Sequence, residues 1–533
     1  MLSISSLYLT EYLESEYDYK IIGLVDIDLL LQRPRKTLYE LFKQWHKPAF
    51  SPKERIVLFS RKPLSIDTLV HIQKCASLID ISNFFILLCS SSIDQEHLES
   101  VKNSYSTDDC VFSTLAVDIV DTLPTGTKNP LILLPQSFCF SPWAHLEISS
   151  QGEFKPCCVY RESIKDSDGR VFNINDDSIE TVYTSHYLTD LRKQFINGER
   201  PSGCSHCWLA EQHNVKSNRH WTTSYLGVAA QTLQIEQDSI DNIISLDIKL
   251  GNLCNFKCRI CTPGYSSRIA EEQANHFKTV IDLKTLNQKG QWVNHSEIWK
   301  MLGTLGSQLI NIDFYGGEPF LIKQHEVFLN YLIDQNHASK IRLHYNSNGS
   351  VYPSHLFEKW KCFKQVDIAF SIDNIGQRFE LERGGDWQKV QQNLDQFLAS
   401  KLPNMELNVF TTINVQNVYY LEELIDWFET KNFNSLFFNL LERPKFLSIS
   451  SMNDELSRAI IDRLCLIGQT KIEKYNLNTF IEMIKQNKNS SDMIDELREY
   501  MLKLDNIRNQ NFKHTHSEIA NIIYRGNYHE QTV

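Results

Sequence analysis

Three cysteines stand close together near the middle of the chain, at Cys254, Cys258 and Cys261. Their CxxxCxxC spacing can turn three thiolates toward one point, and thiolates are ligands of zinc, copper(I) and iron-sulfur clusters. A structural zinc site normally has a fourth Cys or His nearby, but none follows within the next dozen residues. The motif therefore favours a metal group with one open coordination position, with structural zinc as the alternative.

A second group of four cysteines lies nearer the N-terminus: Cys139, Cys157, Cys204 and Cys207. The first two flank strand-like residues 145–149 and 153–156, and a hairpin around the turn SSQG would bring them together. The last two form a CxxC pair that can complete a four-thiolate site for zinc or an iron-sulfur cluster. We interpret the adjacent Cys158 as a packed core residue, with a spare ligand or a substrate-facing thiol as alternatives.

Polar residues and glycines follow three other strand-like runs. One run ends in Gly316, Gly317, Glu318 and Pro319, where paired glycines permit close backbone approach and the carboxylate can accept from an ammonium. A plain tight turn is the alternative for this motif. Another run ends in a polar cluster that includes Asn346, whose side chain could reach a bound ligand or a substrate.

Ser371 and Asp373 alternate in phase at the end of a further run, so a hydroxyl and a carboxylate point the same way. Both can hydrogen-bond to the hydroxyl groups of a ligand, and capping the next turn is the alternative. Arg383, in the stretch LERGGDW, can meet a carboxylate or lie on the solvated surface.

Together these motifs resemble the radical S-adenosylmethionine (SAM) superfamily. In that family, CxxxCxxC after a first strand holds a four-iron four-sulfur cluster, and SAM binds the fourth iron. The resemblance implies this role for Cys254, Cys258 and Cys261. It also implies contacts with SAM, to its amino group from the GGEP motif at 316–319 and to its ribose from Ser371 and Asp373.

The second cysteine group resembles the auxiliary-cluster module called twitch, a shortened SPASM domain. The pattern C-x(12)-G-x(4)-C runs from Cys139 to Cys157, and the CxxC pair of Cys204 and Cys207 follows it. In the resembled module, four cysteines bind a second four-iron four-sulfur cluster. The usual module follows the radical SAM core, whereas this one precedes it.

Strand-like and helix-like runs alternate from residue 243 to residue 440 and must position these motifs. We expect strands at residues 243–250, 309–314, 340–345, 366–371, 405–412 and 435–440. We expect helices at residues 265–278, 297–305, 324–335, 354–361, 387–399 and 421–431. This pattern predicts an α/β fold with a partial (β/α)6 barrel, in which the chemistry gathers on the loops after the strands.

Four parts of the chain are predicted. They are a small α/β domain with a possible docking role at 1–125, a twitch-like domain and bridge at 131–235, the radical SAM partial barrel at 236–445 and a helical C-terminal region at 446–533. The first part is expected to hold strands at 21–25, 55–59 and 84–89 with helices at 37–46, 66–78 and 95–104. Helices are also expected at 454–466, 479–485, 492–504 and 517–523, and this tail is expected to cover the open side of the barrel, with Cys465 in its core.

Composition limits the environment and the partners. The formal net charge of -11 argues against a nucleic-acid surface, which needs clustered Lys and Arg. The N-terminus is acidic and has no signal-peptide pattern, and no apolar run approaches the ~20 residues that span a bilayer. Thirteen cysteines in such a chain indicate metal binding rather than disulfides. We therefore expect a cytoplasmic protein without membrane insertion.

The resemblance implies an enzyme that takes an electron from an external donor and cleaves SAM reductively, and then uses the 5'-deoxyadenosyl radical on a substrate. Its cofactors would be SAM, the SAM-binding cluster and a second, auxiliary four-iron four-sulfur cluster. Resemblance to SPASM and twitch enzymes favours a peptide or protein side chain, modified by crosslinking, oxidation or epimerisation. The alternatives are a radical SAM oxidoreductase acting on a small molecule and a non-catalytic protein with two zinc knuckles. No catalytic residue that quenches the substrate radical can be assigned.

Overall fold

The computed structural model describes residues 20–26, 54–60, 84–88, 112–113, 131–132, 137–212, 217–220, 222, 239–277, 281–486 and 493–525. Its backbone forms two compact units. Unit 1 contains residues 1–146, 155–171 and 178–244, and unit 2 contains residues 147–154, 172–177 and 245–533. The helical C-terminal residues thus belong to the same unit as the strands that precede them, and the four-part division of the chain stays a prediction.

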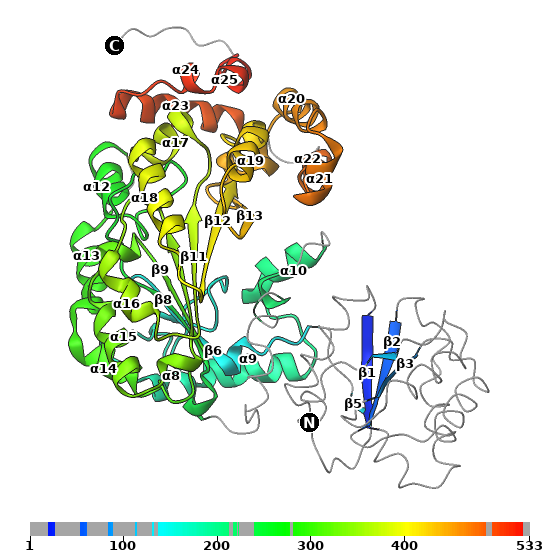
Figure 1. The fold of residues 1–533 in the computed structure, drawn as a ribbon, viewed down its shortest axis with the longest axis vertical. Coiled ribbons are helices and arrows are strands. Elements are labelled where there is room, and N and C mark those ends of the chain that lie inside the picture. The colour runs from blue at the N-terminus through cyan, green and yellow to red at the C-terminus, as the bar shows by residue number, and fades with distance from the viewer. Residues whose placement is uncertain are drawn as a thin grey trace. The chain divides into compact units, whose positions relative to one another are not determined.

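Unit 1 begins with a five-stranded sheet, of which β1, β2, β3 and β5 are labelled in Figure 1. Its strands are β1 (Lys20–Asp26), β2 (Glu54–Ser60), β3 (Phe84–Leu88), β4 (Phe112–Ser113) and β5 (Leu131–Ile132). The order is β4-β3-β2-β1-β5, and only β5 runs antiparallel to its neighbour. The three strands expected here are confirmed, whereas the three expected helices lie outside the described residues.

The cysteine-rich part follows with short elements. They are α7 (Ser141–Ala144), β6 (His145–Ile148), β7 (Phe154–Lys155), α8 (Ile179–Tyr183), α9 (His186–Ile196), η1 (Ser202–Cys204) and α10 (Ser205–Gln212). β6 and β7 are sheet neighbours, so the expected hairpin is confirmed. Residues 179–196 form two helices, α8 and α9, rather than one. Ser178 and Ser185 each cap the start of one helix, because their side-chain oxygens accept from backbone N–H groups. Leu188, Leu191 and Phe195 of α9 are buried, as its apolar stripe indicates.

Unit 2 is built on six parallel strands that are hydrogen-bonded in chain order. They are β8 (Ser245–Lys249), β9 (Asn311–Tyr315), β10 (Arg342–Ser347), β11 (Gln365–Ser371), β12 (Met405–Ile413) and β13 (Ser435–Leu440). β6 and β7 extend this sheet beyond β8 to eight strands. Parallel pairing brings the carboxyl ends of all six strands to one edge, as the predicted (β/α)6 arrangement requires.

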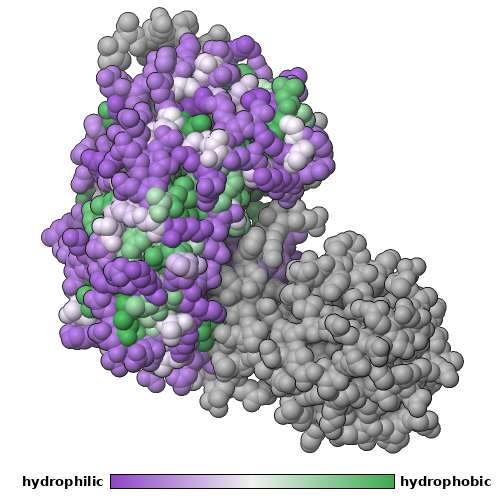
Figure 2. All heavy atoms as spheres, in the orientation of Figure 1, coloured by the Kyte–Doolittle hydropathy of each residue, from purple (hydrophilic) through white to green (hydrophobic). Residues whose placement is uncertain are grey.

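Helices follow the strands and cover one side of the sheet (Figure 1). They are α12 (Ser267–His276), α13 (Leu283–Gly290), η4 (Gln291–Asn294), α14 (Ser296–Gly303), α15 (His325–Asp334), α16 (Phe357–Trp360), α17 (Gly376–Arg383), α18 (Trp387–Ala399) and α19 (Leu421–Glu429). Their apolar sides pack on the strands through large buried side chains: Trp360 contacts Tyr345 of β10 and Phe397 contacts Phe370 of β11, with ring centroids 5.6 and 5.0 Å apart. The coloured atoms of Figure 2 are largely hydrophilic, as expected for amphipathic helices.

The C-terminal region is helical, as predicted. Its helices are α20 (Asp454–Cys465), α21 (Gln469–Lys474), α22 (Asn478–Gln486), α23 (Ile494–Arg508), α24 (Phe512–Thr515) and α25 (Ser517–Ile523). Tyr475 and Phe480 pack against Phe438 of the edge strand β13, with ring centroids 6.5 and 5.6 Å apart. The prediction that Cys465 is a core residue is wrong, because this cysteine is exposed on α20. Among the described residues, no helix has the length and apolar character to cross a membrane.

Candidate metal centres

The loop that follows β8, residues 250–263, carries Cys254, Cys258 and Cys261, and we name it the cysteine loop. Its first residue continues the strand pairing, because Leu250 N donates to Tyr315 O over 2.8 Å. Residues 316–318, which follow β9, then bind the backbone of the cysteine loop through their own backbone. Gly317 N donates to Gly251 O (3.2 Å) and Glu318 N donates to Leu253 O (2.8 Å).

Gly316 and Gly317 are required by this backbone contact. A Cβ atom on Gly317 would lie 2.0 Å from Leu253 O, and one on Gly316 would lie 2.7 Å from Gly251 O. Gly316 also has a φ of +94°, in the region that only glycine adopts freely. The glycines were predicted to let backbone approach a ligand, and the structure shows that the group they approach is the cysteine loop itself.

The three thiols of the cysteine loop are partly buried and interact with one another. Burial, followed by the charge of Cys258, raises the pKa of Cys254 to about 11. The same two causes raise the pKa of Cys261 to about 12. Burial also raises the pKa of Cys258, while the nearby Arg383 guanidinium opposes this shift. Three such thiols need positive charge to exist as thiolates, and bound metal ions supply it.

Glu318, whose N–H contacts the cysteine loop, is completely buried. One carboxylate oxygen accepts from Ser347 Oγ (2.9 Å) and Phe320 N (3.3 Å), and the other accepts from Asn348 N (2.7 Å). Burial raises its pKa to about 7, against the effect of these hydrogen bonds. The carboxylate therefore joins the end of β9 to the end of β10, and its contact with the SAM amino group stays a prediction.

Asn348 belongs to the polar cluster at the end of β10, and no sequence motif distinguished it from its neighbours there. Its side-chain amide donates to Asn255 Oδ1 (3.1 Å) and lies 3.7 Å from Cys254 Sγ. Asn346, the residue selected from that cluster, lies within β10 and contacts His344 Nε2 at 3.1 Å. No described contact joins Asn346 or Ser371 to the cysteine loop, although both stand at the same edge of the sheet.

Asp373 and Arg383 form a buried ion pair beside the cysteine loop. Asp373 also accepts from Thr412 N over 2.8 Å, so its carboxylate joins β11 to β12. The carbonyl of Arg383 accepts from Lys257 N (3.2 Å) and contacts Cys258 Sγ (3.6 Å). The alternative left open for Arg383 is thus decided: it is buried and meets a carboxylate.

The residues around the cysteine loop fit the group that the sequence motif implies. Three thiols lie on one loop, and Arg383 Nε is a buried donor without a partner among the described residues. A cation and an unused donor beside three thiols suit a negatively charged group at this place. The arrangement could therefore hold an iron-sulfur cluster and a polar ligand next to it.

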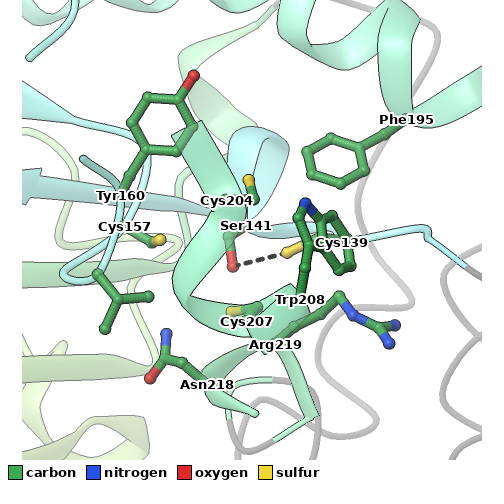
Figure 3. Close-up of a pocket in the computed structure, with 11 residues that line it drawn as sticks. Cys139, Ser141, Cys157, Tyr160, Phe195, Cys204, Cys207, Trp208, Asn218 and Arg219 are labelled. Carbon is green, nitrogen blue, oxygen red and sulfur yellow. Dashed lines mark hydrogen bonds between the residues drawn. The ribbon is translucent and has the colours of Figure 1, made fainter. Parts of the chain in front are cut away.

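The second cysteine group lies in unit 1 and lines a pocket with about 310 Å³ of empty space, counting its open mouth. The lining residues are Cys139, Ser141, Cys157, Val159, Tyr160, Phe195, Cys204, Cys207, Trp208, Asn218 and Arg219. Figure 3 shows the four sulfur atoms arranged around the same space. The four cysteines predicted to act together are therefore brought together.

Burial controls the chemistry of this pocket. It raises the pKa of Cys139 to about 11, where a hydrogen bond from this thiol to Ser141 Oγ (3.4 Å) acts in the opposite direction. Burial also raises the pKa of Cys157, Cys204 and Cys207. Four buried thiols around one space fit a bound group of several metal ions, which would stabilise their thiolates.

Arg219 is a pocket residue that no motif indicated. Its guanidinium donates to Phe138 O (2.9 Å) and Glu211 Oε1 (3.0 Å) and lies 5.8 Å from the centre of the Trp208 ring. These contacts fix a positive charge at the wall of the pocket, where it lowers the pKa of Cys204 against the effect of burial. Its partners are up to 81 residues away, so local spacing could not reveal it.

Cys158 does not line the pocket. Its thiol is partly exposed and lies 3.9 Å from Asn218 Oδ1. The packed-core interpretation is therefore only partly met. In the described part of the chain, no three His, Cys, Asp or Glu side chains converge as ligands of one metal ion, and the four cysteines surround a space instead.

Two family models match the chain at the two cysteine groups. Residues 248–429 match the radical SAM superfamily, and residues 139–208 match SPASM, an iron-sulfur cluster-binding domain. The chain thus contains a radical SAM domain with a SPASM domain N-terminal to it. The resemblance to these two families and the α/β fold class, both predicted from the sequence, are confirmed. These domains imply SAM, a four-iron four-sulfur cluster and additional iron-sulfur binding, in agreement with the predicted cofactors.

Among curated proteins, the chain is similar to two GTP 3',8-cyclases. It is 23% identical to that of Syntrophomonas wolfei subsp. wolfei over 190 residues, which are 35% of this chain and 51% of the relative. It is 22% identical to that of Actinobacillus pleuropneumoniae serotype 3 over 255 residues, which are 45% of this chain and 68% of the relative. The chain therefore spans about half the length of the first relative.

Among solved structures, the chain is similar to native anSMEcpe with bound AdoMet and to Streptococcus suis SuiB bound to precursor peptide SuiA. The first is 20% identical, with a TM-score of 0.31, and the match covers 48% of this chain and 66% of the other. The second is 12% identical, with a TM-score of 0.29, and the match covers 55% of this chain and 66% of the other.

Proposed function

We propose that this chain, which contains a radical SAM domain and an N-terminal SPASM domain, is an enzyme that modifies a peptide or protein side chain by radical chemistry. The observation that carries the proposal is the pair of separate cysteine sites, one with three thiols and one with four. Three ligands leave one iron of a four-iron cluster open for SAM, whereas four ligands close the second cluster.

The first site serves SAM. Cys254, Cys258 and Cys261 hold the cluster, and residues that follow β9, β10 and β11 contact the cysteine loop. Glu318 and Asp373 orient the loops that face SAM, since each carboxylate joins two neighbouring strands. When bound, the cluster and SAM supply the 5'-deoxyadenosyl radical, for which an external donor provides the electron. The protein's own part is to position the substrate and exclude water.

The second site serves the substrate. Cys139, Cys157, Cys204 and Cys207 hold the auxiliary cluster in a pocket that Trp208 and Arg219 also line. A fully ligated cluster there can anchor the substrate or accept its electron after hydrogen abstraction. We also propose a cytoplasmic location, where thiolates remain reduced.

Metal analysis tests the proposal directly. Two four-iron clusters require about eight iron atoms per chain, with matching sulfide. A colourless protein with two zinc ions would instead support the zinc-knuckle alternative. Reductive cleavage of SAM to 5'-deoxyadenosine by the anaerobically purified protein then separates an enzyme from a cluster-binding protein.

A small-molecule substrate is the second candidate, and the similarity to GTP 3',8-cyclases favours it. The two candidates differ in the molecule that is modified during turnover, a peptide or a small molecule, and mass spectrometry distinguishes them. Incubation with short peptides encoded near the gene, followed by mass spectrometry, should yield a modified peptide if the first proposal holds. Consumption of GTP or another small molecule, with unmodified peptides, would support the second.

Glu318 and Asp373 provide a prediction about SAM affinity. Glu318→Gln or Asp373→Asn should weaken SAM binding by about 1 to 3 kcal/mol, because a charged hydrogen-bonding partner is lost from a buried site. Titration calorimetry with the reconstituted protein measures the change, and the iron content should stay at the wild-type value. Asp395→Asn, which removes an exposed partner of Lys431, is the control and should leave affinity unchanged. Wild-type affinity in both site variants would leave these residues only their structural roles.

A further inference from the structure

Helix α23 of the C-terminal region packs against the cysteine loop with one face. Tyr500, Met501, Asp505 and Arg508 all contact that loop, and their spacing follows the helical repeat. The contacts join residues 241 to 251 positions apart in the chain. In Figure 1, α23 lies beside α24 and α25 at the end of unit 2 where α17 also lies.

Two of these contacts hold the peptide groups on either side of Cys258. Arg508 donates to the carbonyl of Lys257 over 2.7 Å, and Tyr500 Oη donates to the carbonyl of Arg259 over 2.7 Å. The main-chain N–H of Arg259 is held as well, because it donates to Glu382 O (2.7 Å). The backbone of the central cysteine is thus fixed from both sides by side chains of α23.

The cysteine loop also reaches α23 with a side chain of its own, that of Arg259. This side chain is fully buried, pairs with Asp505 and donates to Gln510 Oε1 (2.9 Å) and Leu381 O (3.1 Å). Asp505 also accepts from Phe512 N over 2.7 Å, so the same carboxylate orders the turn that follows α23. An arginine between two cysteines is therefore held in place by a carboxylate from the far end of the chain.

The charges at this contact form one network of three cations and two carboxylates. Arg508 pairs with Glu272 of α12 (2.6 Å), and Glu272 also meets Lys257 Nζ (3.3 Å). Two cations of the loop and one of α23 thus face two buried or half-buried carboxylates. Removing one member leaves a buried charge without its partner, which is far more costly than losing an exposed pair.

We propose that α23 is a positioning element for the SAM-binding cluster, which holds the three cysteines in place through Tyr500, Asp505 and Arg508. The inference rests on the proposed function, because it assigns the cysteine loop to that cluster. None of the three residues touches the reacting atoms. Their effect passes through the backbone beside Cys258 and through Arg259, in the way that outer partners orient metal ligands.

The test uses the full-length protein with both clusters. Asp505→Asn keeps the shape of the side chain but removes the charge that faces Arg259. We expect a chelator to remove iron from the SAM-binding cluster about tenfold faster or more in this variant. Iron in the auxiliary cluster, held by unit 1, should be lost at the wild-type rate. The part of the reduced electron paramagnetic resonance spectrum that responds to SAM reports the first cluster, and the rest reports the second.

Tyr500→Phe is the milder companion variant, because it removes a single hydrogen bond to Arg259 O. It should speed iron loss in the same direction but by a smaller factor, and it keeps the test valid if Asp505→Asn does not fold. Glu455→Gln, which breaks the exposed pair with Arg525, is the matched control in the same helical region and should change neither cluster.

Selective loss of the first cluster in these variants supports the proposal. Equal loss of both clusters would show that α23 contributes only to the general stability of the protein. Unchanged iron release in Asp505→Asn and Tyr500→Phe would show that α23 does not position the cysteine loop. Either result overturns this inference but leaves the proposed function standing. A wild type without SAM-responsive iron overturns the proposed function together with it.

Discussion

Formation of 5'-deoxyadenosine is expected to fall to background when Cys254, Cys258 or Cys261 is replaced by Ala. Two thiolates hold a four-iron cluster poorly, and the open iron is then lost as a defined position for SAM. The loss should be complete rather than partial, because the chemistry belongs to the cluster and its bound SAM. Anaerobic assays with a strong chemical reductant and chromatography of the products measure it.

Cys362→Ala and Cys465→Ala are suitable controls, because both cysteines are exposed in the same unit as the cysteine loop. They should retain SAM cleavage at the wild-type rate. Continued 5'-deoxyadenosine formation by the triple variant of Cys254, Cys258 and Cys261 would remove the basis of the radical SAM assignment for this site.

The strands of the barrel could be predicted because the pattern that identifies each strand lies within a few consecutive residues. Each is a short apolar run bounded by polar residues, and burial of such a run in a parallel sheet favours one structure. Met405–Ile413 and Ser435–Leu440 match the expected ranges within one residue. The carboxyl ends then follow from parallel pairing, so the site could be placed on the correct edge.

Between β8 and β13, the two helices α13 and α17 were missed because they lack an apolar stripe. α13 has no buried residue, and α17 buries Glu382 and Arg383 among its apolar side chains. Arg383 is stable there because Asp373 neutralises it, a pairing between separate elements. Periodicity reports which residues face an apolar core, and it therefore fails where the buried face is charged.

Contacts within the site were the hardest to predict from sequence. The GGEP motif marked the correct segment, but the tight neighbours of Gly316 and Gly317 are backbone atoms of the cysteine loop. Asn348, Arg219 and Asp505 contribute through partners between 81 and 246 residues away. Such contacts depend on the packed arrangement of elements, whereas the cysteine spacings carry their chemistry in the chain itself.

The auxiliary site gives the second large effect. Replacing Cys204 and Cys207 together by Ala should halve the iron content and abolish substrate modification, while SAM cleavage without product continues. The reason is that the two thiols belong to the four-cysteine pocket of unit 1, whereas the three thiols of the cysteine loop belong to unit 2. Iron analysis, 5'-deoxyadenosine formation and product mass are measured on the same sample.

Cys158→Ala is the matched control for this variant, since Cys158 neighbours Cys157 in the chain but does not line the pocket. It should keep both clusters and form product. Loss of activity in the double variant counts only if the protein stays soluble and still cleaves SAM, because cluster binding and folding of a small cysteine-rich part are coupled. Full product formation by the double variant, or zinc in place of the second cluster in the wild type, would contradict an auxiliary iron-sulfur site.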